Sequence, residues 1–99
     1  MIVRFATAAE ADLENIADFI ARDNPVRAVS FVAEIIDRCH GLVDAPQGFP
    51  LVPRYERSGI RRRPYGAYLV FYRVEADRIE VLRILNGARD YEAILFPSG

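Results

Sequence analysis

The segment RRRPYGAYLVFYRV at residues 61–74, followed by VLRILNGARD at residues 81–90, decides the fold of this 99-residue chain. Both segments are rich in β-branched, aromatic and aliphatic residues, which is typical of β-strands. We predict strands over residues 60–63, 67–74 and 78–85, with turns at 64–66 and 75–77. Because consecutive strands joined by short turns usually pair side by side, these strands should form an antiparallel sheet.

Upstream of these strands the pattern becomes helical. After a short strand at residues 2–6, Thr7 and Glu10 have the spacing of a capping box, which predicts a helix that begins at Ala8. Asn24 and Pro25 then predict the cap and first turn of a second helix. The two helices should form a hairpin.

A loop rich in proline and glycine follows at residues 44–59, and a short helical turn should come after Gly87. The order of elements predicts one α+β domain over residues 1–99. It contains a strand, a helical hairpin, and a mainly antiparallel sheet of three further strands with a short C-terminal helical turn.

The predicted apolar surfaces exceed what a helical hairpin on one sheet face can cover. The second helix carries a wide apolar stripe, which must be covered on more than one side. In residues 67–74 both faces of the strand are apolar, although an open sheet face should be polar. Either the loop and the C-terminal Tyr91, Ile94, Leu95 and Phe96 cover the second face, or a partner does, and we favour a partner.

The charged residues are unevenly distributed. The chain has 13 arginines, no lysine and 14 acids, and a net charge of −1. Residues 1–53 hold 4 Arg against 8 acids, whereas residues 54–99 hold 9 Arg against 6 acids. The C-terminal half therefore offers a surface for anionic partners.

The sequence does not indicate a metal site, a disulfide or a membrane-spanning segment. One cysteine, Cys39, and one histidine, His40, cannot form an internal disulfide or a Cys/His zinc site, and we expect both to be structural or surface residues. There is no apolar segment long enough to cross a membrane, so a cytoplasmic location is expected.

Three segments together resemble the RelE/ParE toxin superfamily. They are the strand with its Tyr-Arg-Val end at 72–74, the Arg-Ile-Leu-x-Gly-x-Arg-Asp ending at 83–90, and the helix opening ADLENI at 11–16. The similarity covers nearly the whole chain and is closest to ParE-type toxins of bacterial type II toxin–antitoxin modules.

The resemblance implies a non-enzymatic toxin that binds and inhibits DNA gyrase and is neutralised by a ParD-like antitoxin. We expect no cofactor, no metal and no membrane partner, and contact with promoter DNA only through the antitoxin. Arginine suits such an interface because its planar guanidinium group can bind a carboxylate through two parallel hydrogen bonds. We expect antitoxin or target contacts at Arg61, Arg63, Tyr65, Arg73, Arg83, Arg89, Val29, Val32 and Ile36. Strand alternation places Arg62 on the opposite sheet face from Arg61 and Arg63.

Two alternatives remain open. RelE-like relatives cleave messenger RNA on the ribosome, which requires proton-transfer groups beside cations. The lysines used by some nuclease members are absent, and Asn86 stands where many members carry a histidine, so this route would need Tyr65, Tyr91 or Glu80. The other alternative is a non-catalytic nucleic-acid-binding module, although its aromatic residues suit the core equally well.

Overall fold

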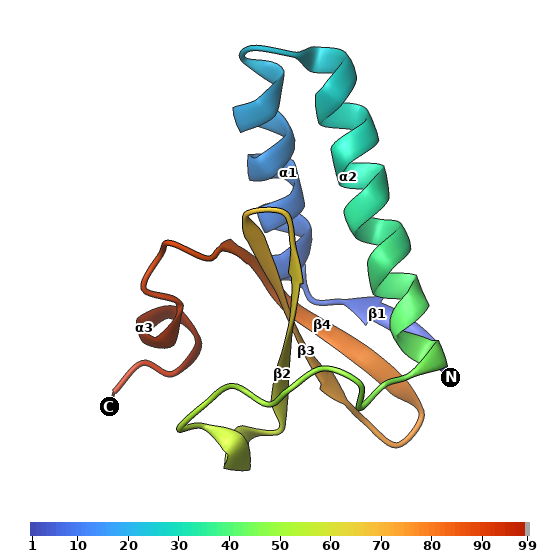
Figure 1. The fold of residues 1–99 in the computed structure, drawn as a ribbon, viewed down its shortest axis with the longest axis vertical. Helices are drawn as coiled ribbons and strands as arrows, with labels where there is room; N and C mark the ends of the chain where they lie inside the picture. Colours follow the sequence, from blue (N-terminus) through green and yellow to red (C-terminus); the bar gives the residue numbers. More distant parts are fainter. Residues whose placement is uncertain (99) are drawn as a thin grey trace.

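The computed structural model describes residues 1–98 and has the predicted order of elements (Figure 1). Strand β1 (Ile2–Phe5) leads into helices α1 (Thr7–Ala21) and α2 (Pro25–His40). After two short 3-10 helices, η1 (Gly41–Asp44) and η2 (Glu56–Ser58), the chain forms strands β2 (Ile60–Tyr65), β3 (Tyr68–Val74) and β4 (Arg78–Asn86), and ends with α3 (Tyr91–Leu95).

The four strands form one sheet in the order β1-β4-β3-β2. Strands β2, β3 and β4 are antiparallel neighbours, whereas β1 pairs parallel to β4, from Ile2 opposite Arg78 to Phe5 opposite Val81. The sheet is therefore mixed, because the helical hairpin carries the chain from β1 across to the far side of the sheet. Strand β2 extends to Tyr65, so the turn is shorter than predicted.

A β-bulge in β4 interrupts the alternation of its side chains. Phe71 pairs with Arg83, but the next residue, Tyr72, pairs with Val81, so β4 has one extra residue at this point. Strict alternation would put Val81 and Leu85 on the same sheet face. Instead Val81 lies in the core beneath the helices and Leu85 in the core on the opposite face, because the bulge shifts the pleat by one residue.

The start of α1 also differs from the prediction. The helix begins at Thr7 and its cap position is Ala6, which makes no side-chain capping bond. The backbone N–H of Ala6 still donates to Val81 of β4 at 2.9 Å, while its carbonyl accepts the first helical bond from Glu10 at 3.0 Å. The sheet therefore fixes the helix start, and the Thr7–Glu10 capping box does not form. In α2, by contrast, Asn24 caps the helix as predicted, accepting from the Arg27 N–H at 3.0 Å.

Two cores lie on the two faces of the sheet. The larger, between sheet and hairpin, contains the fully buried Ile35, Cys39 and Tyr72. The smaller surrounds Phe71, and the chain's own loop and C-terminus cover it with Tyr55, Tyr91, Ile94, Leu95 and Phe96. The expectation that a partner covers this second face is thus wrong. Stacking of Tyr55 on Phe96, with ring centroids 3.9 Å apart, joins the loop to the end of α3.

Half of the large apolar side chains that remain exposed lie on the helical hairpin. Phe19 on α1 is 62% exposed, and Val26 and Val29 on α2 are 81% and 74% exposed. Figure 1 shows that the connection between the helices stands clear of the sheet, which cannot cover side chains there. Cys39 is buried and His40 is exposed, as predicted.

Candidate protein-binding surface

One surface of the protein combines arginines with aromatic rings, and it lies between α2 and β2. From β2 come alternate residues, Arg61, Arg63 and Tyr65, which share the face that meets the helices. From α2 come residues spaced by four, three and four positions, which places them on one helix face. We call this the arginine–aromatic surface; it comprises Arg27, Phe31, Glu34, Arg38, Phe49, Arg61, Arg63 and Tyr65.

The guanidinium groups of this surface rest on aromatic rings. The Arg63 Cζ lies 5.1 Å from the centroid of the Phe49 ring and 5.9 Å from that of Tyr65. The Arg38 Cζ lies 5.4 Å from the Tyr65 centroid, so two cations share one ring. Stacking holds a guanidinium by its flat face and leaves its edge free to form hydrogen bonds. One Arg63 N–H group donates to the Pro64 carbonyl, and the others remain available to a carboxylate. The cations are therefore fixed in place before a partner arrives.

Glu34 is the central acid of the surface. Its carboxylate accepts hydrogen bonds from Arg27 at 2.6 Å and from the Tyr65 hydroxyl at 2.5 Å. The bond from Arg27, followed by that from Tyr65, lowers the pKa of Glu34 below its ordinary value of 4.5. The same bond to Glu34 raises the pKa of Tyr65, so its phenol stays protonated at neutral pH. Glu34 is thus an ionised structural acid and Tyr65 a hydrogen-bond donor.

The remaining charges leave the surface positive. Arg61 donates to the backbone carbonyl of Phe49 at 2.7 Å, which fixes its position without neutralising its charge. Among the described carboxylates, Arg38 forms an ion pair only with that of its exposed chain neighbour Asp37, at 3.0 Å. A hollow of about 170 Å³ opens between Arg38, Arg63 and Phe49, large enough for one side chain of a partner.

The other predicted contact residues lie elsewhere. Arg73 donates to the Ser58 carbonyl at 3.2 Å, and Arg83 forms a two-bond ion pair with Asp12 of α1. Val32 and Ile36 pack partly against the larger core, and Val29 lies exposed on another face of α2. Arg89 lies beside α1, at the end of β4. The structure therefore unites only Arg61, Arg63 and Tyr65 of the nine predicted residues.

Sequence reasoning missed the α2 contribution to this surface. The spacing of Arg27, Phe31, Glu34 and Arg38 carries the signal, because it repeats every three or four residues. The sequence-based prediction relied on the apolar stripe of this helix, which lies on the opposite side. Arg62 points to the other sheet face as predicted, where it donates to the Tyr91 hydroxyl at 2.6 Å.

The groups named for proton transfer do not converge. Tyr65 packs with the larger core and Tyr91 with the smaller, on opposite faces of the sheet. Glu80 lies beside Arg78, with 3.1 Å between the carboxylate oxygen and the guanidinium Nε. Within residues 1–98, no three His, Cys, Asp or Glu side chains are grouped so that they could hold a metal ion. No helix in this part is long and apolar enough to cross a membrane.

Comparison with solved structures identifies the class of protein. A chain of the chromosomal ParDE toxin–antitoxin system from P. aeruginosa superposes with a TM-score of 0.72 at 26% sequence identity, over 87% of this chain and 95% of that one. A chain of the RelBE2 toxin–antitoxin complex from Mycobacterium tuberculosis gives a TM-score of 0.65 at 25% identity, over 89% and 92%. The fold is that of the RelE/ParE toxins.

The sequence narrows this class to one family. A family model described as the ParE toxin of the type II toxin–antitoxin system, parDE, matches residues 3–91. The chain belongs to this ParE toxin family. A comparison with curated proteins found no match.

Proposed function

We propose that this ParE-family toxin is held inactive by a ParD-like antitoxin and acts, when free, by binding DNA gyrase. The observation that carries the proposal is the arginine–aromatic surface. Three of its four guanidinium groups rest on rings, and among residues 1–98 Glu34 is the one carboxylate that bonds across it. A rigid, positive surface of this kind binds protein carboxylates with little loss of side-chain entropy.

The antitoxin segment suited to this surface is acidic. An extended chain along β2 can bring a carboxylate to the N–H groups of Arg63 and Arg38, and a side chain into the hollow between them. An amphipathic helix of the antitoxin would in turn cover the exposed Phe19, Val26 and Val29 of the hairpin. The antitoxin would thus cover the two surfaces that the fold leaves unmatched.

Gyrase binding, as opposed to RNA cleavage, is supported by the placement of the proton-transfer candidates. General acid–base catalysis needs two such groups within hydrogen-bond reach of one substrate. Here Tyr65 and Tyr91 lie on opposite faces of the sheet, and Tyr65 is already committed to Glu34. A protein that inhibits an enzyme by binding needs a surface and no such pair.

The first test is an assay of gyrase supercoiling with purified toxin, alone and with its antitoxin, alongside ribosome-dependent mRNA cleavage on the same preparation. We expect inhibition that the antitoxin relieves, and no cleavage. Ribosome-dependent cleavage without gyrase inhibition would refute the gyrase proposal and establish the RelE-like activity.

A second test locates the antitoxin contact. We expect Arg63→Gln to weaken antitoxin binding about tenfold, corresponding to one charge-assisted hydrogen bond. Arg57→Gln is the matched control, because Arg57 is an exposed arginine on η2, which precedes β2 and contributes no residue to the arginine–aromatic surface. Equal affinities of the two variants, measured by calorimetric titration, would show that the antitoxin does not use the arginine–aromatic surface.

A further inference from the structure

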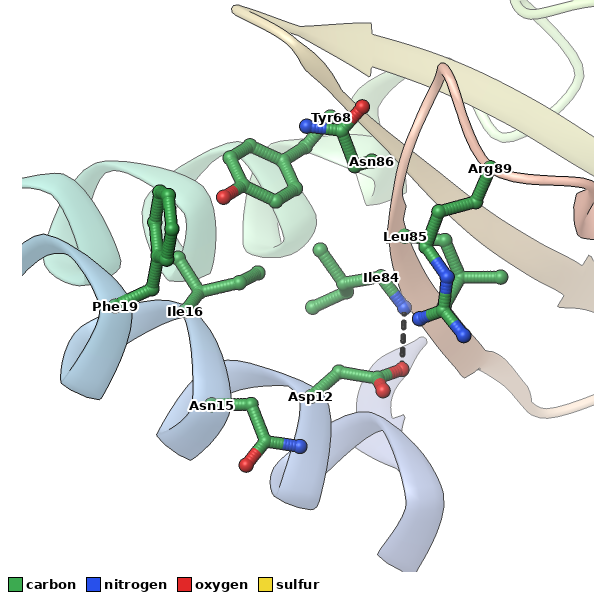
Figure 2. Close-up of a pocket in the computed structure, with 9 residues that line it drawn as sticks. All are labelled: Asp12, Asn15, Ile16, Phe19, Tyr68, Ile84, Leu85, Asn86 and Arg89. Atoms are coloured by element: carbon green, nitrogen blue, oxygen red, sulfur yellow. Dashed lines mark hydrogen bonds between the residues drawn. The ribbon is translucent and has the colours of Figure 1, made fainter.

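A separate hollow of about 160 Å³ lies between α1 and the end of β4 (Figure 2). Helix α1 supplies one wall and the last residues of β4, with Arg89 beyond them, supply the other. Figure 2 shows the side chains of Asn15, Tyr68 and Arg89 around this space. The complete lining is Asp12, Asn15, Ile16, Phe19, Tyr68, Ile84, Leu85, Asn86 and Arg89.

The hollow exists because β1 is shorter than β4. Pairing between the two strands stops at Phe5 and Val81, so the second half of β4 pairs with β3 on one side but has no strand on its other side. Asp12 of α1 takes the place of a strand there, and its carboxylate accepts from the backbone N–H of Ile84 at 2.8 Å. Arg83 donates twice to the same carboxylate, at 2.8 and 3.0 Å. The Asp12 charge is therefore fully compensated within the fold.

The donors that face the hollow are not compensated. Within residues 1–98, the side-chain hydrogen bonds and the ion pair of the lining residues involve Asp12 and Asn86. They do not involve the Arg89 guanidinium, the Asn15 amide or the Tyr68 hydroxyl. Asn86 uses its amide oxygen to accept from the Ala88 N–H at 2.9 Å, which leaves its NH₂ group as a donor. The hollow thus offers one net positive charge and several neutral donors above an apolar floor of Ile16 and Ile84.

Size and charge together select the ligand. Pockets for small molecules and cofactors span about 300–1,000 Å³, so this hollow holds a single side chain and not a whole nucleotide. One guanidinium matches one carboxylate, whereas a nucleic-acid backbone would also meet the three other acids of α1, at positions 10, 14 and 18, with no basic residue in that helix. Phe19, 62% exposed at the rim, adds an apolar contact beside the charged one.

We propose that this hollow is a carboxylate-binding site that holds one Asp or Glu side chain of the antitoxin segment packed along α1. The proposal rests on the antitoxin function proposed above. It adds a second anchor point, separated from the arginine–aromatic surface, that fixes the position of the bound segment along the helix.

The test is a double-mutant cycle by calorimetric titration of toxin with antitoxin. We expect Arg89→Gln to reduce affinity about fivefold, the effect of a partly exposed ion pair. Asn15→Asp, which places a negative charge in the hollow, should reduce it further, to about tenfold. Arg57→Gln should change it less than about twofold. Each Asp and Glu of the antitoxin segment is changed in turn to Asn or Gln, and one of these changes should remove the effect of Arg89→Gln.

The outcomes separate the two proposals. Wild-type toxin that binds its antitoxin, with Arg89→Gln indistinguishable from Arg57→Gln, overturns the carboxylate site alone. The carboxylate site is also overturned if Arg89→Gln lowers the affinity and no change of an antitoxin Asp or Glu removes that effect, because Arg89 then contacts some other group. Failure of the wild-type toxin to bind the antitoxin overturns the antitoxin function itself, and the carboxylate site with it.

Discussion

The ion pair between Asp12 and Arg83 allows the sharpest prediction about stability. Asp12 is 7% exposed, and three hydrogen bonds converge on its carboxylate, two from Arg83 and one from the Ile84 N–H. Asp12→Ala removes all three acceptor contacts at once. It leaves a partly buried guanidinium and a buried backbone N–H without partners, which is far costlier than losing an exposed charge.

The magnitude follows from the burial of the two groups. Removing one partner of a buried ion pair costs about 3–5 kcal/mol. The Arg83 side chain is 27% exposed and can regain some water contacts, so we expect a loss at the lower end, about 3 kcal/mol. For a domain of this size each kcal/mol lowers Tm by about 4–8 °C, which predicts a drop of at least about 12 °C.

Thermal unfolding monitored by circular dichroism measures this effect, with Asp18→Ala as the control. Asp18 is an exposed acid on the same helix, and its removal should change stability by less than about 0.5 kcal/mol. The double variant Asp12→Ala with Arg83→Met should recover part of the loss, because no unpaired guanidinium remains. A Tm for Asp12→Ala equal to that of Asp18→Ala would refute the reasoning that Asp12 holds α1 to the edge of β4.

Three further predictions concern single residues. Burial raises the pKa of the Cys39 thiol to about 12, so Ellman's reagent at pH 8 should react with Cys39 only after unfolding in urea, and rapid reaction of the native protein would contradict its burial. Because folding lowers the pKa of Glu34, its stabilising effect is present above the ordinary value of 4.5 and is lost as pH falls through the lowered value. On acidification, the Tm of Glu34→Gln should therefore fall less than that of the wild type. Parallel curves of Tm against pH for the two proteins would count against the Arg27–Glu34–Tyr65 contacts. Gly66 has a φ of +56° in the turn between β2 and β3, so Gly66→Ala should lower the free energy of unfolding, measured in urea, by about 1 kcal/mol. Ala67→Gly, at the next position, is the control, and an equal loss there would show that any change in this turn has the same effect.

Sequence patterns were sufficient for most of the fold because they report local preferences. Alternating apolar residues, the Asn24–Pro25 start of α2 and the turn residues each act over a few positions, and the structure has the strands and helices they predict. The resemblance to the RelE/ParE toxins was also carried by short motifs, and the family comparison confirmed it.

Only the tertiary structure decided which residues meet. The bulge in β4, the start of α1 at Thr7 and the covering of the second sheet face all depend on contacts between distant segments, which local patterns do not encode. The same holds for the arginines. The sequence predicted partner contacts for both Arg63 and Arg83. Folding separates them, because Arg63 stacks on rings whereas Arg83 is bound to Asp12, and pairing depends on distance in space and not along the chain.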